Sequence, residues 1–307
     1  MSEAVPDFTE EEVQHMLDNL DSFSDKEVVE INRIVDELAV RKANQEAFDD
    51  LIEFCKRMQP DYIVGKHHRI LADLLMSIEQ GDKDRICVNI PPRHGKSQLV
   101  SIFFPAWFLG RNPGKKVMMV SHTTDLAVDF GRKVRNLIST EAYQAIFSTV
   151  QLASDSKSAG RWNTNTGGEY YACGIGSSIA GRGADLLLVD DPHSEQDVIN
   201  GNFETFSKAY DWFTFGARTR LMPGGRVAII QTRWHMDDLT GRVVKDMTQN
   251  ERADQYEIVE FPALLDMDDE ETGEPIQKPL WPEFFDLEAL LRTKASMPTF
   301  QWNAQYQ

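Results

Sequence analysis

The sequence has few cysteines and no long run of apolar residues. Its 3 cysteines lie far apart, without the paired spacing of metal ligands, so we interpret them as reduced packing residues. The longest apolar stretch, around residues 101–109, is far too short to cross a bilayer. Residues 1–12 are acidic and lack the apolar core of a secretory signal. The sequence therefore predicts a cytoplasmic protein without a signal peptide or a transmembrane segment.

Positive charge is also scarce. The chain has 32 basic and 49 acidic residues and a net charge of −17, whereas a protein that grips DNA along its surface usually presents a basic face. Residues 1–57 hold 16 acidic and 6 basic residues, so this segment supplies −10 of the −17. The composition argues against passive coating of DNA, but it leaves room for a local basic patch and transient DNA contact.

The first part of the chain is predicted to be helical. Thr9 with Glu12, and Ser24 with Glu27, match the capping box that begins a helix, and apolar residues follow each box at helical spacing. The outer faces of these helices are strongly acidic. We expect a solvated helical appendage packed on a main domain, and the alternative is a dedicated partner-binding element.

From residue 66 onward, β-prone runs alternate with helical periodicity. This alternation predicts a mostly parallel sheet with helices on both faces. We also expect a hairpin around residues 165–168, a flexible loop over residues 174–183 and an acidic surface loop over residues 266–278. The predicted strands cover residues 85–90, 116–121, 185–189, 226–232 and 256–261.

Residues 91–97, with the sequence PPRHGKS, follow the first predicted strand and precede a helical run. This is the context of a phosphate-binding loop, in which backbone N–H groups and a helix N-terminus attract phosphates. Lys96 can reach the β- and γ-phosphates of ATP, and Ser97 can ligate Mg²⁺. Ile90 occupies the position of the usual first glycine. The expected nucleotide contacts are Pro92, Arg93, His94, Gly95, Lys96, Ser97 and Gln98.

Two side chains of this loop have open roles. Arg93 can reach the γ-phosphate from within the same subunit, or it can brace the loop. We expect His94 to shape the loop rather than perform chemistry.

Residues 186–191, with the sequence LLLVDD, are four apolar residues followed by two carboxylates. A buried parallel strand delivers such acids to the carboxyl edge of the sheet, where ligands of α/β proteins bind. Asp190 is expected to hold Mg²⁺, and Asp191 to orient and deprotonate the attacking water. Glutamate is more usual in the second role, so Glu195 is a rival for the catalytic base.

Three segments in this order, PPRHGKS, GRGADLLLVDDPH and RVAIIQTRWHMDDLTGR, resemble the ATPase half of tailed-phage terminase large subunits. The closing segment, residues 280–307, is similar to the stretch that ends that half, and the resemblance covers about residues 66–307. It implies a P-loop NTPase fold of the ASCE/RecA-like kind. It also implies an ATP-hydrolysing, Mg²⁺-dependent motor that drives double-stranded DNA into a procapsid.

The resemblance also implies partners and a place of action. The motor would meet the portal protein and the small terminase subunit at the portal vertex in the host cytoplasm. It would form a ring there, expected to be a pentamer, and be a monomer or weak oligomer when free.

The resemblance assigns further roles to residues. It makes Gln231-Thr232-Arg233 a coupling motif, with Thr232 at the nucleotide, and it places the helix that begins at Lys66 beside the adenine, where His67, His68 or Arg69 could touch the base. A neighbouring subunit often completes such sites with an arginine. The candidates are Arg161, Arg182 and Arg220, with Arg182 ranked first.

The chain departs from the full family pattern. Family members continue into a nuclease domain, which is not expected here, so the chain is either a truncated form or a one-domain relative. We expect an acidic helical appendage over residues 1–60 and a P-loop ATPase domain over residues 61–307, with a C-terminal subdomain or linker from about residue 262.

Other function classes remain open from the sequence. A nucleotide-gated assembly protein would bind ATP without hydrolysing it. A helicase-type remodelling ATPase would need a second RecA-like domain, for which too few residues follow Phe261. A metal-dependent hydrolase built on Asp190, Asp191, His193 and His235 would leave the phosphate loop unexplained.

Overall fold

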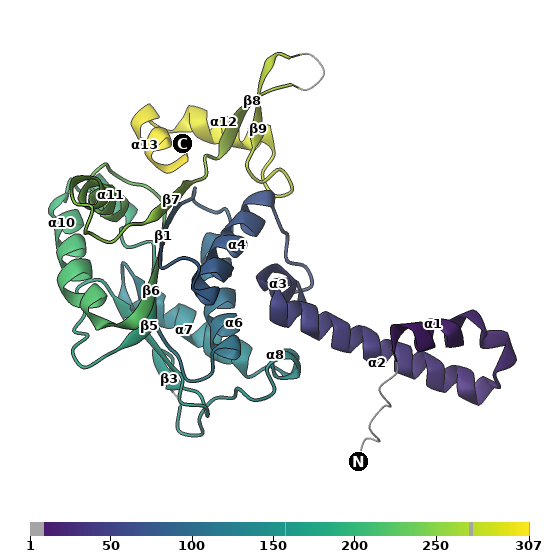
Figure 1. Ribbon diagram of the computed structural model, residues 1–307. Helices are drawn as coiled ribbons and strands as arrows, with labels where there is room; N and C mark the ends of the chain where they lie inside the picture. The colour runs from purple at the N-terminus through teal and green to yellow at the C-terminus, as the bar shows by residue number, and fades with distance from the viewer. Residues whose placement is uncertain (1–8, 157, 270–272, 307) are drawn as a thin grey trace.

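The centre of the protein is a seven-stranded sheet with the order β3-β4-β2-β5-β6-β1-β7 (Figure 1). The computed structural model describes residues 9–156, 158–269 and 273–306. Neighbouring strands are parallel except β3, which is antiparallel to β4. The strands are β1 Arg85–Asn89, β2 Lys116–Ser121, β3 Arg161–Asn163, β4 Glu169–Gly174, β5 Ala184–Asp190, β6 Leu221–Gln231 and β7 Glu257–Glu260.

Helices cover both faces of this sheet, as Figure 1 shows. One face packs with α3, α4, α6 and α7, and the other with α10 and α11. Two π-helical segments, Leu99–Phe103 and Trp212–Ala217, continue α5 and α10. From residue 51 onward the α-helices are α3 Leu51–Met58, α4 Lys66–Gln80, α5 Lys96–Gln98, α6 Phe104–Arg111, α7 Thr124–Ile138, α8 Glu141–Ile146, α9 Glu195–Ile199, α10 Glu204–Asp211, α11 Leu239–Gln249, α12 Leu287–Ser296 and α13 Thr299–Tyr306.

The sheet has a hydrophobic core on each of its two faces, because side chains alternate between the faces along every central strand. Successive side chains of a strand point to opposite faces, so a strand buried on both sides is apolar throughout. In β1, Ile86 and Val88 belong to the core beneath α4, whereas Cys87 belongs to the core beneath α11. The five strands predicted from apolar runs are confirmed as β1, β2, β5, β6 and β7. The predicted hairpin is confirmed as β3–β4, with Gly167 at φ 86° in its turn.

The N-terminal helices α1 (Glu10–Asp18) and α2 (Asp25–Asp49) form a hairpin, most of which extends away from the sheet (Figure 1). Both predicted capping boxes are present. Val13 and Ile34 form a small core of their own, whereas Ala47 at the end of α2 is fully buried in the main core. The predicted division of the chain at residue 60 stays a prediction.

The segment after β7 is more ordered than the sequence suggested. The prediction of a surface loop over residues 266–278 is wrong, because β8 (Leu264–Asp268) and β9 (Pro275–Pro279) pair as an antiparallel hairpin. Helices α12 and α13 follow, and Trp302 of α13 packs with Ala263, Leu264 and Leu290. Across the described ranges, none of the helices has the length and apolar content that a membrane span requires.

Candidate nucleotide-binding site

A cavity of about 610 Å³ lies at the carboxyl edge of the sheet, where β1, β5 and β6 end. Its volume falls within the range of small-ligand pockets. The strand β6 lies between the two strands that carry the predicted phosphate loop and the predicted acidic pair. The lining residues are Pro92, Arg93, Gly95, Lys96, Ser97, Gln98, Asp191, Glu195, Thr232, Trp234, Gln305 and Tyr306.

The loop after β1 has a backbone conformation that depends on its glycine. Gly95 has φ 77°, in the left-handed region, and a Cβ atom there would overlap Nε2 of His68. Arg93 also has a positive φ of 64°, and its side chain is exposed at the cavity. The His94 side chain does not line the cavity, because it is buried beside Phe285 with Nδ1 2.8 Å from the carbonyl oxygen of Pro92. His94 therefore shapes the loop.

Lys96 joins the loop to the acidic strand end. Its Nζ lies 2.8 Å from Oδ2 of Asp191, and its side chain is only 8% exposed. Burial opposes the positive charge of Lys96, but the carboxylates of Asp191 and Asp190 outweigh burial and hold its pKa above the usual value. A charged ammonium group therefore sits at the floor of the cavity.

Asp190 lies behind this ion pair and is 1% exposed. Burial, reinforced by the neighbouring Asp191, raises the pKa of Asp190 to about 6. Ser101 donates a hydrogen bond to Oδ2 at 2.6 Å, and the side chain of Ser97, which lines the cavity, lies near enough to act against the rise in the pKa of Asp190. Among the described residues, Oδ1 of Asp190 has no hydrogen-bond partner. A hydroxyl and a partly unpartnered carboxylate are oxygen donors that suit Mg²⁺.

Both candidates for the catalytic base reach the cavity. Asp191 has φ 44°, and its Oδ1 accepts the N–H of Thr232 at 2.8 Å, so both of its carboxylate oxygens have partners. Glu195 is the first residue of α9 and is exposed. The arrangement therefore brings the two carboxylates to one cavity.

The turn after β6 is organised by a buried carboxylate. Oδ2 of Asp238, which is fully buried, accepts from Nε of Arg233 at 2.9 Å and from the N–H of Trp234 at 3.1 Å. Thr232 reaches the cavity as predicted, whereas Arg233 is held on Asp238 and is not among the lining residues.

Sequence reasoning missed three lining residues: Trp234, Gln305 and Tyr306. Trp234 belongs to the segment RVAIIQTRWHMDDLTGR, which carries part of the family resemblance, so the sequence could have marked it. Gln305 and Tyr306 reach the site only because α13 folds back, where Ala263 N–H bonds the carbonyl oxygen of Tyr306 at 2.8 Å.

Two of the three candidate arginines for a neighbouring site, Arg182 and Arg220, lie at the opposite, amino edge of the sheet. Arg182 precedes β5, with Nη1 3.5 Å from Glu169 and its guanidinium 4.8 Å from the ring centre of Tyr171. Arg161 bonds the same Glu169 oxygen at 3.1 Å, and Arg220 directly precedes β6. Since β5 itself is about 20 Å long, Arg182 cannot reach the cavity of its own chain.

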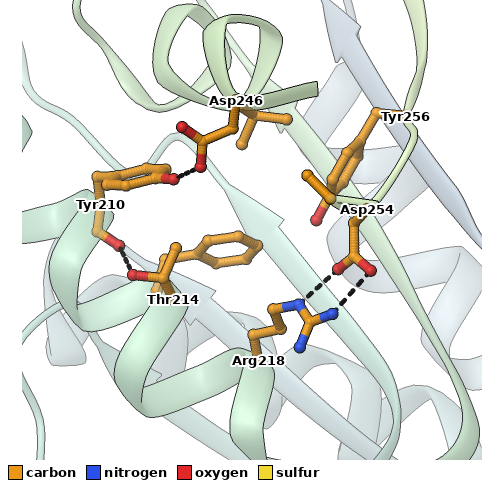
Figure 2. Close-up of a pocket in the computed structure, with 9 residues that line it drawn as sticks. Tyr210, Thr214, Arg218, Asp246, Asp254 and Tyr256 are labelled. Atoms are coloured by element: carbon orange, nitrogen blue, oxygen red, sulfur yellow. Dashed lines mark hydrogen bonds and ion pairs between the residues drawn. The ribbon is translucent and has the colours of Figure 1, made fainter. Parts of the chain in front are cut away.

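A smaller cavity of about 170 Å³ lies beneath α10 and α11 (Figure 2). Its charged groups already pair with partners of their own, since Tyr210 bonds Asp246, and Arg218 bonds Asp254 at 2.6 and 2.8 Å. Burial opposes ionisation of Asp254, but Arg218 and Arg85 overcome it and lower the pKa. Arg218, the basic residue that lines this cavity, is therefore already paired with a carboxylate and is not available to bind phosphate.

The metal-hydrolase alternative gains no support from the geometry. Nε2 of His193 accepts the N–H of Leu239 at 2.9 Å, in a buried position. Within the described parts of the chain, no group of three or more His, Cys, Asp or Glu side chains is placed to hold a metal ion.

Comparison with known proteins gives a consistent result. The family described as terminase large subunit, T4-like-virus type, N-terminal, matches residues 87–295. The structure is similar to the large terminase of bacteriophage HK97, with 13% identity and a TM-score of 0.52 over 84% of this chain and 53% of that one. It is also similar to the large terminase ATPase domain of Thermus phage P74-26, with 15% identity and a TM-score of 0.47 over 76% and 91%. No curated protein sequence matches the chain.

These findings settle the fold and the family. The likeness to the HK97 protein confirms the predicted P-loop NTPase fold, a mostly parallel sheet flanked by helices. The chain spans about half of the length of that protein. Because the family match covers more than half of its 307 residues, the chain belongs to the T4-like-virus type of terminase large subunits.

Proposed function

We propose that this chain is the ATP-hydrolysing motor that powers the movement of double-stranded viral DNA into a procapsid. The observation that carries the proposal is the meeting of Lys96 and Asp191, 2.8 Å apart, at the floor of a cavity of about 610 Å³. The two residues come from the phosphate loop and the acidic strand end, which are the parts that P-loop ATPases use for phosphoryl transfer. Membership in the terminase family supports DNA packaging as the purpose of the hydrolysis.

In this proposal the loop from Pro92 to Gln98 binds the phosphates of ATP, and Lys96 neutralises the β- and γ-phosphates. Ser97 and Asp190 hold Mg²⁺, which supplies positive charge that stabilises the transferring phosphoryl group. Asp191 or Glu195 orients the attacking water and accepts its proton. Thr232 connects the site to β6 through its bond to Asp191.

Two arginines would add charge stabilisation in the transition state. Arg93 is exposed at the cavity of its own chain. Arg182 would serve the site of a neighbouring subunit, since it lies at the far edge of its own sheet. Such a contact joins unlike surfaces and closes into a ring, for which we propose five subunits on the procapsid.

The proposed partners are double-stranded DNA, the portal protein and the small terminase subunit. The motor would work at the portal vertex in the host cytoplasm. The nuclease activity of the larger family members is not proposed for this chain.

The test is ATP hydrolysis by the wild type and by Lys96→Ala and Asp191→Ala, with Mg²⁺, DNA and procapsids present. We expect turnover by the wild type and a loss of at least about a hundredfold in both variants. Lys133→Ala is the matched control, because this lysine pairs with Asp129 on the surface of α7. A wild type that binds ATP but never hydrolyses it would instead identify a nucleotide-gated assembly protein.

A further inference from the structure

Two adjacent histidines at the start of α4 contact the back of the phosphate loop. The Nε2 atoms of His67 and His68 lie 3.0 and 3.1 Å from the carbonyl oxygen of His94. Both side chains are fully buried, and neither lines the cavity. Because a carbonyl oxygen has two lone pairs, it can accept a hydrogen bond from each ring. The sequence predicted that these histidines could touch adenine, but in the structure they contact the phosphate loop instead.

The tautomer of His68 follows from its other partner. Its Nδ1 accepts the N–H of Gly65 at 3.0 Å, so the proton of the neutral ring is on Nε2 and is donated to His94. Burial lowers the pKa of both histidines, that of His68 to about 3. Both rings are therefore neutral near pH 7 and serve as hydrogen-bond donors to the loop.

The anchored carbonyl fixes the direction of the next amide group. In a planar trans peptide the C=O and the N–H point in opposite directions. Holding the His94 carbonyl against α4 therefore turns the Gly95 N–H away from α4, and Gly95 itself lines the cavity. Successive N–H groups of such a loop are what binds phosphate oxygens.

The loop has a conformation that needs outside support. Arg93 holds a positive φ without being glycine, and such strained backbones persist only where the surroundings fix them. Two aromatic rings also pack against the histidines that make this contact. Trp281 packs edge-on against His68, with ring centres 4.7 Å apart, and Phe285 lies 5.1 Å from His94.

We propose that His67 and His68 are positioning residues of the phosphate site, which aim the Gly95 N–H at the phosphates by holding the His94 carbonyl. The proposal rests on the proposed function as an ATPase. It assigns the histidines a role in nucleotide affinity that is separate from their contribution to the core.

The test compares two amide variants of different reach. In His67→Gln the amide nitrogen is at the ε position and replaces the donor, whereas in His67→Asn it is one methylene too short. His67 suits this test because, among the described residues, its Nδ1 makes no hydrogen bond of good geometry, although the backbone of Leu280 lies near enough to act against the lowering of the His67 pKa. Binding of a fluorescent ATP analogue with Mg²⁺ is measured on the full chain, below the melting temperature of each variant.

We expect His67→Asn to weaken binding about tenfold, and His67→Gln to stay within about threefold of wild type. Leu71→Ala is the control for general loosening of α4, since Leu71 is fully buried one turn further along the helix. It should lower the melting temperature and leave the affinity unchanged. Equal affinities for the wild type and both His67 variants would overturn the positioning role, whereas a wild type that binds no ATP would overturn the proposed function instead.

Discussion

Gly95 shows how one residue connects the sequence motif to the geometry of the site. Its φ of 77° is strained for any residue with a Cβ, and the ring of His68 occupies the space that a Cβ would need. The Gly-Lys-Ser tripeptide alone is a weak signal. Its value here comes from the carboxylates of Asp190 and Asp191, which the sheet brings to the same edge.

Gly95→Ala should therefore weaken ATP binding by at least about tenfold, because the loop must shift to separate Cβ from His68. Equilibrium binding of a fluorescent ATP analogue measures this effect. Gly181→Ala is a matched control, since Gly181 has a similar φ of 75° with nothing within 4 Å of its added Cβ. An affinity of Gly95→Ala equal to that of wild type would show that the loop tolerates the displacement.

Asp191 and Glu195 can be separated by substitutions that keep their size. If Asp191 is the base, Asp191→Asn should reduce kcat by at least about a hundredfold, and Glu195→Gln by less than about fivefold. The reverse order would identify Glu195. Single-turnover ATP hydrolysis distinguishes the two outcomes, with nucleotide binding of each variant measured alongside.

At the scale of elements, the sequence predicted the parts that local patterns encode. The runs in β1, β2, β5 and β6 are apolar because these strands are buried on both faces, and that property is visible without a structure. The β8–β9 hairpin was missed, because acidic, proline-containing and glycine-containing residues resemble a loop. The position of α13 was missed because it depends on a contact between residues far apart in the chain, Ala263 and Tyr306.

Helix α13 is predicted to support the nucleotide cavity through Trp302. This side chain is 1% exposed, and its ring stacks on that of Tyr306, which lines the cavity. Trp302→Ala should destabilise the packing of α13 by about 3–5 kcal/mol and weaken ATP binding, while the sheet stays folded. Phe300→Ala on the same helix is the control, since Phe300 is 65% exposed. Circular dichroism measures the stability, and nucleotide titration measures the affinity for ATP. An unchanged affinity in a destabilised Trp302→Ala variant would contradict the prediction.

At the scale of the whole molecule, the two halves of the proposed active site lie on opposite edges of the sheet. The cavity is at the carboxyl edge, and Arg182 is at the amino edge, so two chains must meet head to tail to join them. With a net charge of −17, free chains also repel each other. The proposed ring would therefore need a platform that brings the chains together.

We expect the free chain to sediment as a monomer or a weak oligomer at about 0.15 M salt, where exposed charges act over about 8 Å. Sedimentation velocity over a range of protein concentrations provides the measurement. A stable pentamer of this chain alone would contradict the requirement for a platform.

The central claim is that ATP binds with its phosphates on the loop from Pro92 to Gln98. A crystal structure with a non-hydrolysable ATP analogue and Mg²⁺ tests it most directly. The account predicts the β- and γ-phosphates against the backbone of Gly95 and Lys96, Mg²⁺ near Ser97 and Asp190, and either Asp191 or Glu195 facing the attacking water. A nucleotide bound elsewhere, or phosphates that leave the loop untouched, would contradict it.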